Sequence, residues 1–317
     1  MHKNFMNYAK VVFAFSIALL VYGIFLEYED SKKLIDPIND VTTVKQDDDN
    51  SVSITPSEGS EVVSNDNSNN NSNNNTVQNN TTVSTLDQTN DKLRKAIQDR
   101  YSITVLYGSE TEGYTVKNGD STITTEPINN ATLVNSQLTR LNETLSLYPK
   151  GMFKEIKDGG IPLTVVLINN YSENGVTGVT DSSYSYANIS IAASYPFEES
   201  FFHESYHYIE RYMFKKGANF NSWDSLNPSG FSYGTGYSNY SYSNTFDPKA
   251  PFVNNYAQTA ATEDRASTFE YMMASSKASC LNEGNPVWKK ATYMSRTIDV
   301  VLNTVSPDTV EYWERHL

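Results

Sequence analysis

The stretch SYPFEESFFHESYHYIERYMFKKG, residues 194–217, carries the signal that decides the fold. Two of the chain's four histidines, His203 and His207, lie four residues apart in it, and Glu204 follows the first of them. Residues four apart share one face of an α-helix, so both imidazoles can reach the same ion. Glu204 is rotated by about 100° from His203, which places it to exchange a proton with a water at that ion. The pattern predicts a Zn²⁺ site with a general base beside it.

The same stretch contains the signals of a helix over residues 196–214. Ser194 can cap its N-terminus, and Gly217 can close its C-terminus. Two glutamates in the first turn and two lysines at the end complement the helix dipole. One apolar stripe at helical spacing should face the core, and it consists of Phe202, Tyr206, Ile209 and Met213.

A catalytic zinc site needs a third protein ligand and one open position. The two remaining histidines, His2 and His316, lie at the ends of the chain and do not fit this role. The third ligand is therefore expected to be a carboxylate from a helix predicted over residues 254–273. Three acids on this helix are candidates: Glu263, Asp264 and Glu270.

The segment NNYAQTAATEDRASTFEYMM, residues 254–273, resembles the segment with the third ligand in glutamate-zincins of the anthrax lethal factor and Pro-Pro endopeptidase type. The matching residues are Tyr256, Glu263, Asp264, Ala266 and Phe269, together with HESYH upstream. The resemblance implies that Glu263 is the third zinc ligand and that Tyr256 hydrogen-bonds the developing oxyanion. The second acid of the family falls on Ser267 here, so no role is carried over for it. Asp264 is expected to accept a hydrogen bond from one imidazole N–H.

Residues 91–317 are expected to form one α+β domain of the zincin type, with a small mixed sheet. Strands are predicted over residues 103–108, 113–126 (a hairpin), 161–169 and 187–194, and helices over 91–102, 131–148, 196–214, 254–273 and 285–305. The strand at 187–194 should border the cleft, where it could pair with an extended substrate. The Tyr-, Ser- and Asn-rich loop at 218–252 either recognises substrate or packs as irregular scaffold around Trp223 and Phe231.

The first 90 residues are not expected to belong to the α+β domain. Residues 1–10 should be a short cytoplasmic N-terminus, and residues 11–28 a transmembrane anchor, with a cleaved signal peptide as the alternative. Lysines precede the apolar run and acids follow it, which places the rest of the chain outside the cell. Residues 29–90 are rich in Asn and Ser and too poor in apolar residues to fold, so they should be a tether.

The charge and the cysteine content of the chain exclude a class of partner and a kind of cross-link. The chain has 37 acids against 24 bases, a formal net charge of -13, which argues against a nucleic-acid partner. The single cysteine, Cys280, excludes an internal disulfide. The sequence therefore predicts a monomeric, membrane-tethered, extracellular zinc metallopeptidase that acts on a protein or peptide. The alternative is a catalytically inactive zincin-like binding module with a structural zinc, although such a site has no use for Glu204.

Overall fold

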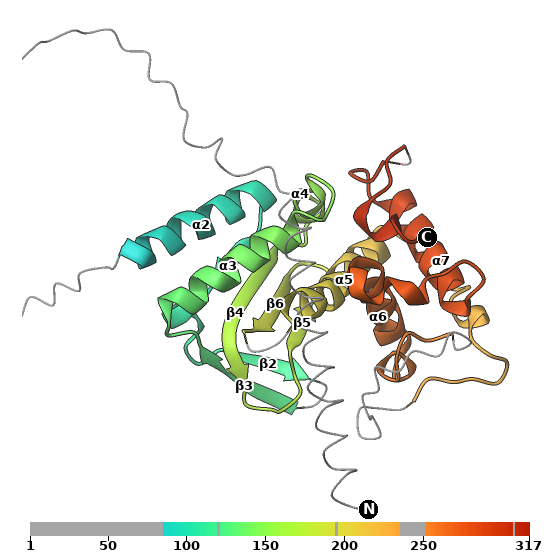
Figure 1. The fold of residues 1–317 in the computed structure, drawn as a ribbon, viewed down its shortest axis with the longest axis horizontal. Coiled ribbons are helices and arrows are strands. Elements are labelled where there is room, and N and C mark those ends of the chain that lie inside the picture. Colours follow the sequence, from blue (N-terminus) through green and yellow to red (C-terminus); the bar gives the residue numbers. More distant parts are fainter. Residues whose placement is uncertain (1–84, 119–120, 194–195, 235–250, 307) are drawn as a thin grey trace, which may run out of the picture. The chain divides into compact units, whose positions relative to one another are not determined.

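The computed structural model describes residues 85–118, 121–193, 196–234, 251–306 and 308–317 (Figure 1). The predicted anchor at 11–28, residues 29–84 of the predicted tether and the Ser194 cap lie outside these residues. The predicted end of the tether at residue 90 is wrong, because residues 85–90 belong to a helix that starts at Thr85 and buries Asn90. In the part that is described, no helix has both the length and the hydropathy needed to cross a bilayer. The same part contains a small mixed sheet and six α-helices, so the predicted α+β class is confirmed.

The six strands form one sheet in the order β2-β3-β4-β6-β5, with β1 parallel to β4. The strands are β1 (Thr104–Leu106), β2 (Thr115–Asn118), β3 (Ser121–Pro127), β4 (Leu163–Tyr171), β5 (Gly178–Ser182) and β6 (Ala187–Ala192). The α-helices are α2 (Thr85–Tyr101), α3 (Ala131–Leu145), α4 (Met152–Asp158), α5 (Phe197–Lys215), α6 (Ala261–Met273) and α7 (Pro286–Val301). Neither α4 nor β5 was predicted from the sequence.

The central strand β4 is buried on both faces, as its continuous apolar run predicts. Val165 and Leu167 face the main core, whereas Val166 and Ile168 face a second cluster that the β2–β3 hairpin helps to form. This alternation follows from the period of two along a strand. Figure 1 shows α2 and α3 side by side against the sheet, with α5 between the strands and the pair formed by α6 and α7.

The prediction that strand 187–194 borders the cleft is wrong. The strand observed there, β6, pairs in parallel with β4 and antiparallel with β5, so both of its edges are occupied. The edge position belongs to β5, whose sequence GVTDS has one large apolar residue and shows no alternation. A strand without alternating apolar residues cannot be predicted from hydrophobic periodicity.

The backbone of β5 points its hydrogen-bonding groups outward at alternate residues. Ala192 of β6 donates its N–H to the carbonyl of Thr177, just before β5. This bond identifies the residues of β5 whose N–H and C=O groups point towards β6. With this register, the N–H and C=O groups of Gly178 and Thr180 point away from β6. The outer edge of the sheet therefore presents backbone donors and acceptors directly beside α5.

Helix α5 begins and ends within one residue of its predicted bounds, and its C-terminus closes as expected. Gly217 has a φ of 88°, a left-handed conformation that favours glycine. Ala218 donates its N–H to the carbonyl of Met213 at 3.0 Å, and Gly217 donates to Phe214 at 3.0 Å. These two bonds form a Schellman motif. All four residues of the predicted apolar stripe are buried, so α5 is fixed along its length.

The helix predicted over 254–273 is divided in the structure. A short 3₁₀ turn, η5 (Tyr256–Gln258), precedes an extended residue, Ala260, and α6 starts only after it. The preceding loop is partly scaffold, because Trp223 is fully buried and Phe231 packs against Phe252 with ring centroids 4.6 Å apart. Residues 235–250 of this loop lie outside the described part.

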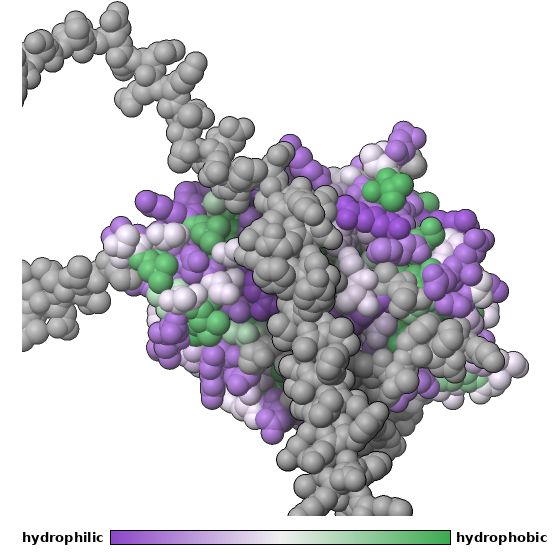
Figure 2. Space-filling view, viewed as in Figure 1, coloured by the Kyte–Doolittle hydropathy of each residue, from purple (hydrophilic) through white to green (hydrophobic). Residues whose placement is uncertain are grey.

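The visible surface of the described residues is mainly polar, with apolar side chains in small separate groups (Figure 2). Few large apolar side chains among the described residues are exposed, and they are Tyr184, Tyr186, Val300, Val310 and Leu317. Most large apolar side chains of the described residues are therefore buried in the core, which includes β4 and α5.

Candidate metal centre

The structure places both predicted histidine ligands on one side of α5. His203 and His207 lie one turn apart, with ring centroids separated by 5.1 Å and ring planes at 77°. Their side chains are 10% and 19% exposed, respectively. Both imidazoles are therefore held in the protein while one side of the pair remains accessible, as a catalytic metal site requires.

Glu263, in the first turn of α6, lies against both histidines. Its Oε2 atom is 3.0 Å from Nε2 of His203 and 3.6 Å from Nε2 of His207. Two ligands of a tetrahedral zinc, each about 2.05 Å from the ion, lie about 3.3 Å apart, which falls between these two values. One ligand atom from each of the three residues lies within 4.8 Å of the others. The three side chains therefore fit a zinc ion.

The two acids beside His203 and the charges around Glu263 shift the pKa values of both side chains. Burial lowers the pKa of His203, but hydrogen bonds with Glu263 and Glu270 outweigh burial and raise this pKa to about 10. Burial raises the pKa of Glu263, and the neighbouring charges of His207 and His203 overcome this and lower it well below its usual value. An imidazole that binds a metal must be neutral, so the raised pKa of His203 opposes metal binding at low pH.

Glu204 lies on the sheet side of the two histidines, against the edge strand β5. It is a buried residue, and its main-chain carbonyl accepts a hydrogen bond from Oγ1 of Thr180 at 2.9 Å. A Cβ atom added at Gly178 would lie 2.7 Å from Cγ of Glu204 and 3.2 Å from its Oε1. The strand thus approaches this carboxylate as closely as only glycine allows, and it limits where the carboxylate can move.

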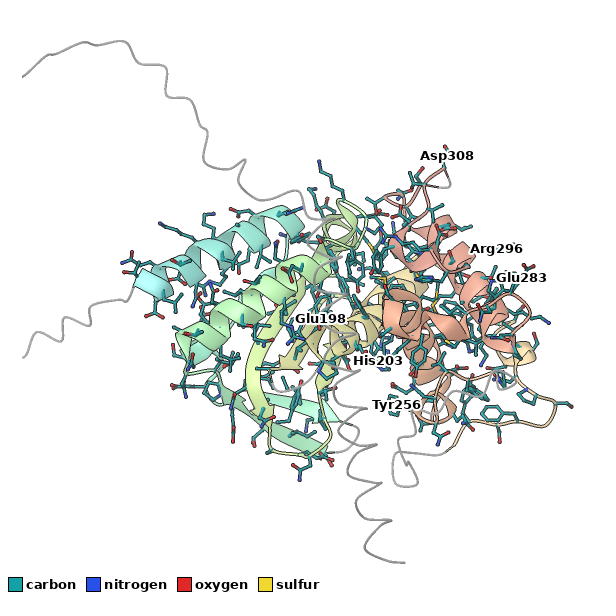
Figure 3. The ribbon with its side chains drawn as sticks, viewed as in Figure 1. Glu198, His203, Tyr256, Glu283, Arg296 and Asp308 are labelled. Atoms are coloured by element: carbon teal, nitrogen blue, oxygen red, sulfur yellow. The ribbon has the colours of Figure 1, made fainter. Side chains whose placement is uncertain are left out.

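Tyr256, the predicted oxyanion donor, lies in η5 beside the first histidine. Its ring centroid is 5.7 Å from that of His203, and the two planes are tilted by 40°. Figure 3 shows the two side chains close together near the middle of the view, with Arg296 and Asp308 away from them at the upper right. The structure therefore brings together His203, His207, Glu263 and Tyr256 from three separate elements.

Three consecutive residues of α6 carry charged side chains to three different buried partners. Glu263 contacts the histidines, Asp264 contacts Lys290, and Arg265 forms an ion pair with Glu210. Every residue of α6 from Glu263 onward is buried, so this helix is enclosed on all sides. Each of these buried charges has a partner of opposite charge or a histidine, and a buried charge without a partner would destabilise the fold.

Asp264 was expected beside an imidazole N–H, and the structure places its hydrogen bonds elsewhere. Its Oδ2 atom accepts from Nζ of Lys290 at 2.6 Å, from Nε1 of Trp223 at 2.8 Å and from the hydroxyl of Tyr233 at 2.7 Å. One residue along a helix turns the side chain by about 100°, which directs Asp264 towards α7 while Glu263 faces α5. The residue therefore joins α6 to α7 and to the loop that carries Trp223.

The carboxylate beside the second ring nitrogen of His203 is Glu270, which the sequence offered only as an alternative ligand. Its Oε2 atom is 3.4 Å from Nδ1 of His203, and its Oε1 atom accepts a hydrogen bond from Lys277 at 2.6 Å. The signal for this contact was present, because Glu270 lies two helical turns after Glu263 and shares its face. Lys277 carried no comparable signal, since it lies beyond the end of α6.

Comparison with protein-family models gives no match, and comparison with curated protein sequences gives none either. A solved structure from Bacteroides caccae, described as a candidate zinc-binding metallo-peptidase, matches with a TM-score of 0.48 and 13% sequence identity. The match covers 72% of this chain and 90% of the other. A likeness of this size does not assign the chain to a family, so the metal centre rests on the contacts among His203, His207 and Glu263.

Proposed function

We propose that this chain is a zinc-dependent peptidase that hydrolyses peptide bonds in a protein or peptide substrate. The observation that carries the proposal is the meeting of Glu263 with both histidines of the H-E-x-x-H helix at distances that suit a tetrahedral ion. A Zn²⁺ ion held by these three side chains would supply a lowered pKa for a bound water and polarisation of the scissile carbonyl.

Glu204 is the general base of the proposed reaction. Its carboxylate takes a proton from the attacking water and later passes that proton to the leaving amine. Burial and contact with Gly178 hold the carboxylate in one place, which such a transfer needs. Tyr256, beside His203, is the donor that hydrogen-bonds the oxyanion as it develops.

The outer edge of β5 is the proposed binding surface for the substrate backbone. Gly178 and Thr180 direct their N–H and C=O groups away from β6, and both residues lie next to Glu204. An extended peptide that adds to this edge as a further strand would pass directly over the general base. Main-chain pairing of this kind supports an enzyme that binds an extended segment of its substrate.

The proposal includes the setting expected from the sequence. Residues 11–28 would anchor the chain in the cell membrane, and the Asn- and Ser-rich residues 29–84, which precede α2, would hold a monomeric catalytic domain outside the cell. Cleavage of residues 11–28 as a signal would instead release the protein. The net charge of -13 supports a partner other than nucleic acid.

Cleavage of a diverse peptide library tests the proposal. The purified zinc-loaded chain is compared with its Glu204→Gln variant, which keeps the size of the side chain and removes its ability to accept the proton. We expect the variant to bind one zinc ion per chain as the wild type does, and to lose cleavage by a factor of about 10²–10⁴.

Two results would contradict this function. Near-normal cleavage by Glu204→Gln would remove the general base from the mechanism. Absence of cleavage by both proteins, with one zinc ion bound to each, would favour the zincin-like binding module with a structural zinc.

A further inference from the structure

His203 contacts an acid at each of its two ring nitrogens. Nε2 faces Glu263 at 3.0 Å, and Nδ1 faces Oε2 of Glu270 at 3.4 Å. Because Glu263 and Glu270 lie seven residues apart on α6, one helix supplies both contacts. Only one of the two nitrogens can bind a metal, so the acid at the other is free to fix the tautomer and the angle of the ring.

The position of Glu270 is itself fixed through Lys277. The ammonium group donates to Oε1 of Glu270 at 2.6 Å and to Oε2 of Glu199 at 2.7 Å. Glu199 lies in the first turn of α5, one turn before His203. The lysine therefore links α6 to the same helix that carries the histidine, and both oxygens of Glu270 have defined partners.

Ser267, where the resembling family has its second acid, does not take part in this arrangement. Its Oγ atom is buried and has no hydrogen-bond partner in the described part of the chain. Glu270 lies three residues, close to one helical turn, further along α6. The acid that reaches the imidazole thus comes from a position that the resemblance does not assign.

We propose that Glu270 is a positioning residue that orients the imidazole of His203 for metal binding, and that the Lys277 bridge holds Glu270 in place. This inference rests on the proposed zinc site but not on peptide cleavage. The carboxylate accepts a hydrogen bond from the N–H at Nδ1, and this keeps the proton on Nδ1 and leaves the lone pair of Nε2 for the ion. The bridge keeps the buried charge of Glu270 compensated when the metal is bound.

Zinc affinity of two matched variants of the full chain tests the proposal. Glu270→Gln and Glu199→Gln each remove one carboxylate charge from Lys277, but Glu199 forms no ion pair with a histidine among the described residues. Zn²⁺ dissociation constants are measured by competition with a chromophoric chelator. The absorption bands of the Co²⁺-substituted proteins report the geometry of the ligands, and unfolding of the metal-free proteins reports any general loss of stability.

Glu270→Gln is expected to weaken zinc binding by about 10- to 100-fold and to shift the Co²⁺ bands. Glu199→Gln is expected to leave zinc affinity within about a factor of two, because Lys277 keeps its own hydrogen bond to Glu270 in this variant. Glu270→Asp, which keeps the charge but shortens the side chain, should give an intermediate loss of affinity and keeps the test valid if Glu270→Gln fails to fold.

Equal zinc affinity in the wild type, Glu270→Gln and Glu270→Asp would overturn the role of Glu270 and leave the proposed peptidase intact. An equal loss in Glu270→Gln and Glu199→Gln would also overturn it, because the effect would then arise from Lys277 alone. A wild type that binds no zinc would refute the metal site itself, and the proposed function with it.

Discussion

Replacing Lys290 by methionine is expected to lower the free energy of unfolding by about 3–4 kcal/mol, because it leaves the carboxylate of Asp264 buried without its cation. Both side chains are 0% exposed, and Nζ of Lys290 lies 2.6 Å from Oδ2 of Asp264. Methionine fills a similar volume, so the loss arises from charge rather than from a cavity. Trp223 and Tyr233 still donate to the carboxylate in the variant, but neither carries a positive charge.

Protonation of Asp264 sets an upper limit to this loss. A group with an ordinary pKa near 3.9 can be protonated at pH 7 at a cost of about 4 kcal/mol, since each pH unit corresponds to about 1.4 kcal/mol. Burial already raises the pKa of Asp264 in the wild type, although Lys290, Tyr233 and Trp223 act in the opposite direction. Removal of the lysine removes the largest opposing cause and raises this pKa further.

The direction of the pH dependence follows from the same group. Because the folded variant has a raised Asp264 pKa, it binds more protons than the unfolded chain above pH 4, and its stability falls as the pH rises towards the folded pKa. The destabilisation relative to wild type should therefore be smaller at pH 5 than at pH 7, by up to about 1.4 kcal/mol per pH unit.

Urea unfolding of the metal-free proteins, followed by tryptophan fluorescence, measures both effects. Lys289→Met is the matched control, because Lys289 is the preceding residue of α7 and is exposed, and its loss should change stability by at most about 0.5 kcal/mol. Asp264→Asn combined with Lys290→Met should recover part of the loss. A loss below about 1 kcal/mol in Lys290→Met, or a loss that does not depend on pH, would refute the reasoning.

Two further predictions concern the candidate site. Glu263→Ala should weaken zinc binding by more than about 100-fold, because loss of a residue that only contacts a ligand can already cost that much. Chelator competition measures the affinity, and a change of less than about threefold would contradict the role of Glu263 as a ligand. Gly178→Ala places a Cβ atom 2.7 Å from Cγ of Glu204 and should displace that side chain. It should lower kcat on the order of tenfold while zinc affinity stays unchanged. Val179→Ala, on the opposite face of β5, is its control, and an equal kcat for the two variants would contradict the assignment.

The sequence predicted the elements whose local signals and tertiary packing agree. Helix α5 has charges suited to its dipole, a glycine at its end and an apolar stripe, and all of these point to the same span. Strand β4 is long and continuously apolar, so it was recognised as buried. The helix that carries Glu263 was recognised as well, but its start was placed too early because nothing in the sequence marks the extended conformation of Ala260.

The features that were missed depend on contacts with other elements rather than on a pattern of their own. Strand β5 is held by its pairing with β6 and by the hydrogen bond from Thr180 to Glu204, neither of which leaves a pattern in GVTDS. The partners of Asp264 and Glu270 also come from other segments, because Lys290 and Lys277 lie 26 and 7 residues away, respectively. Helical periodicity tells which face a side chain occupies, but it does not tell which element packs against that face.

The enclosure of α6 has a consequence for how the length of this chain can vary among its relatives. Inserting or deleting one residue between Glu263 and Glu270 would turn the later part of the helix by about 100° relative to the earlier part. Glu263 and Glu270 would then no longer share one face, and they could not both contact His203. We therefore expect α6 to keep the same number of residues from Glu263 to Glu270 wherever the metal site is retained.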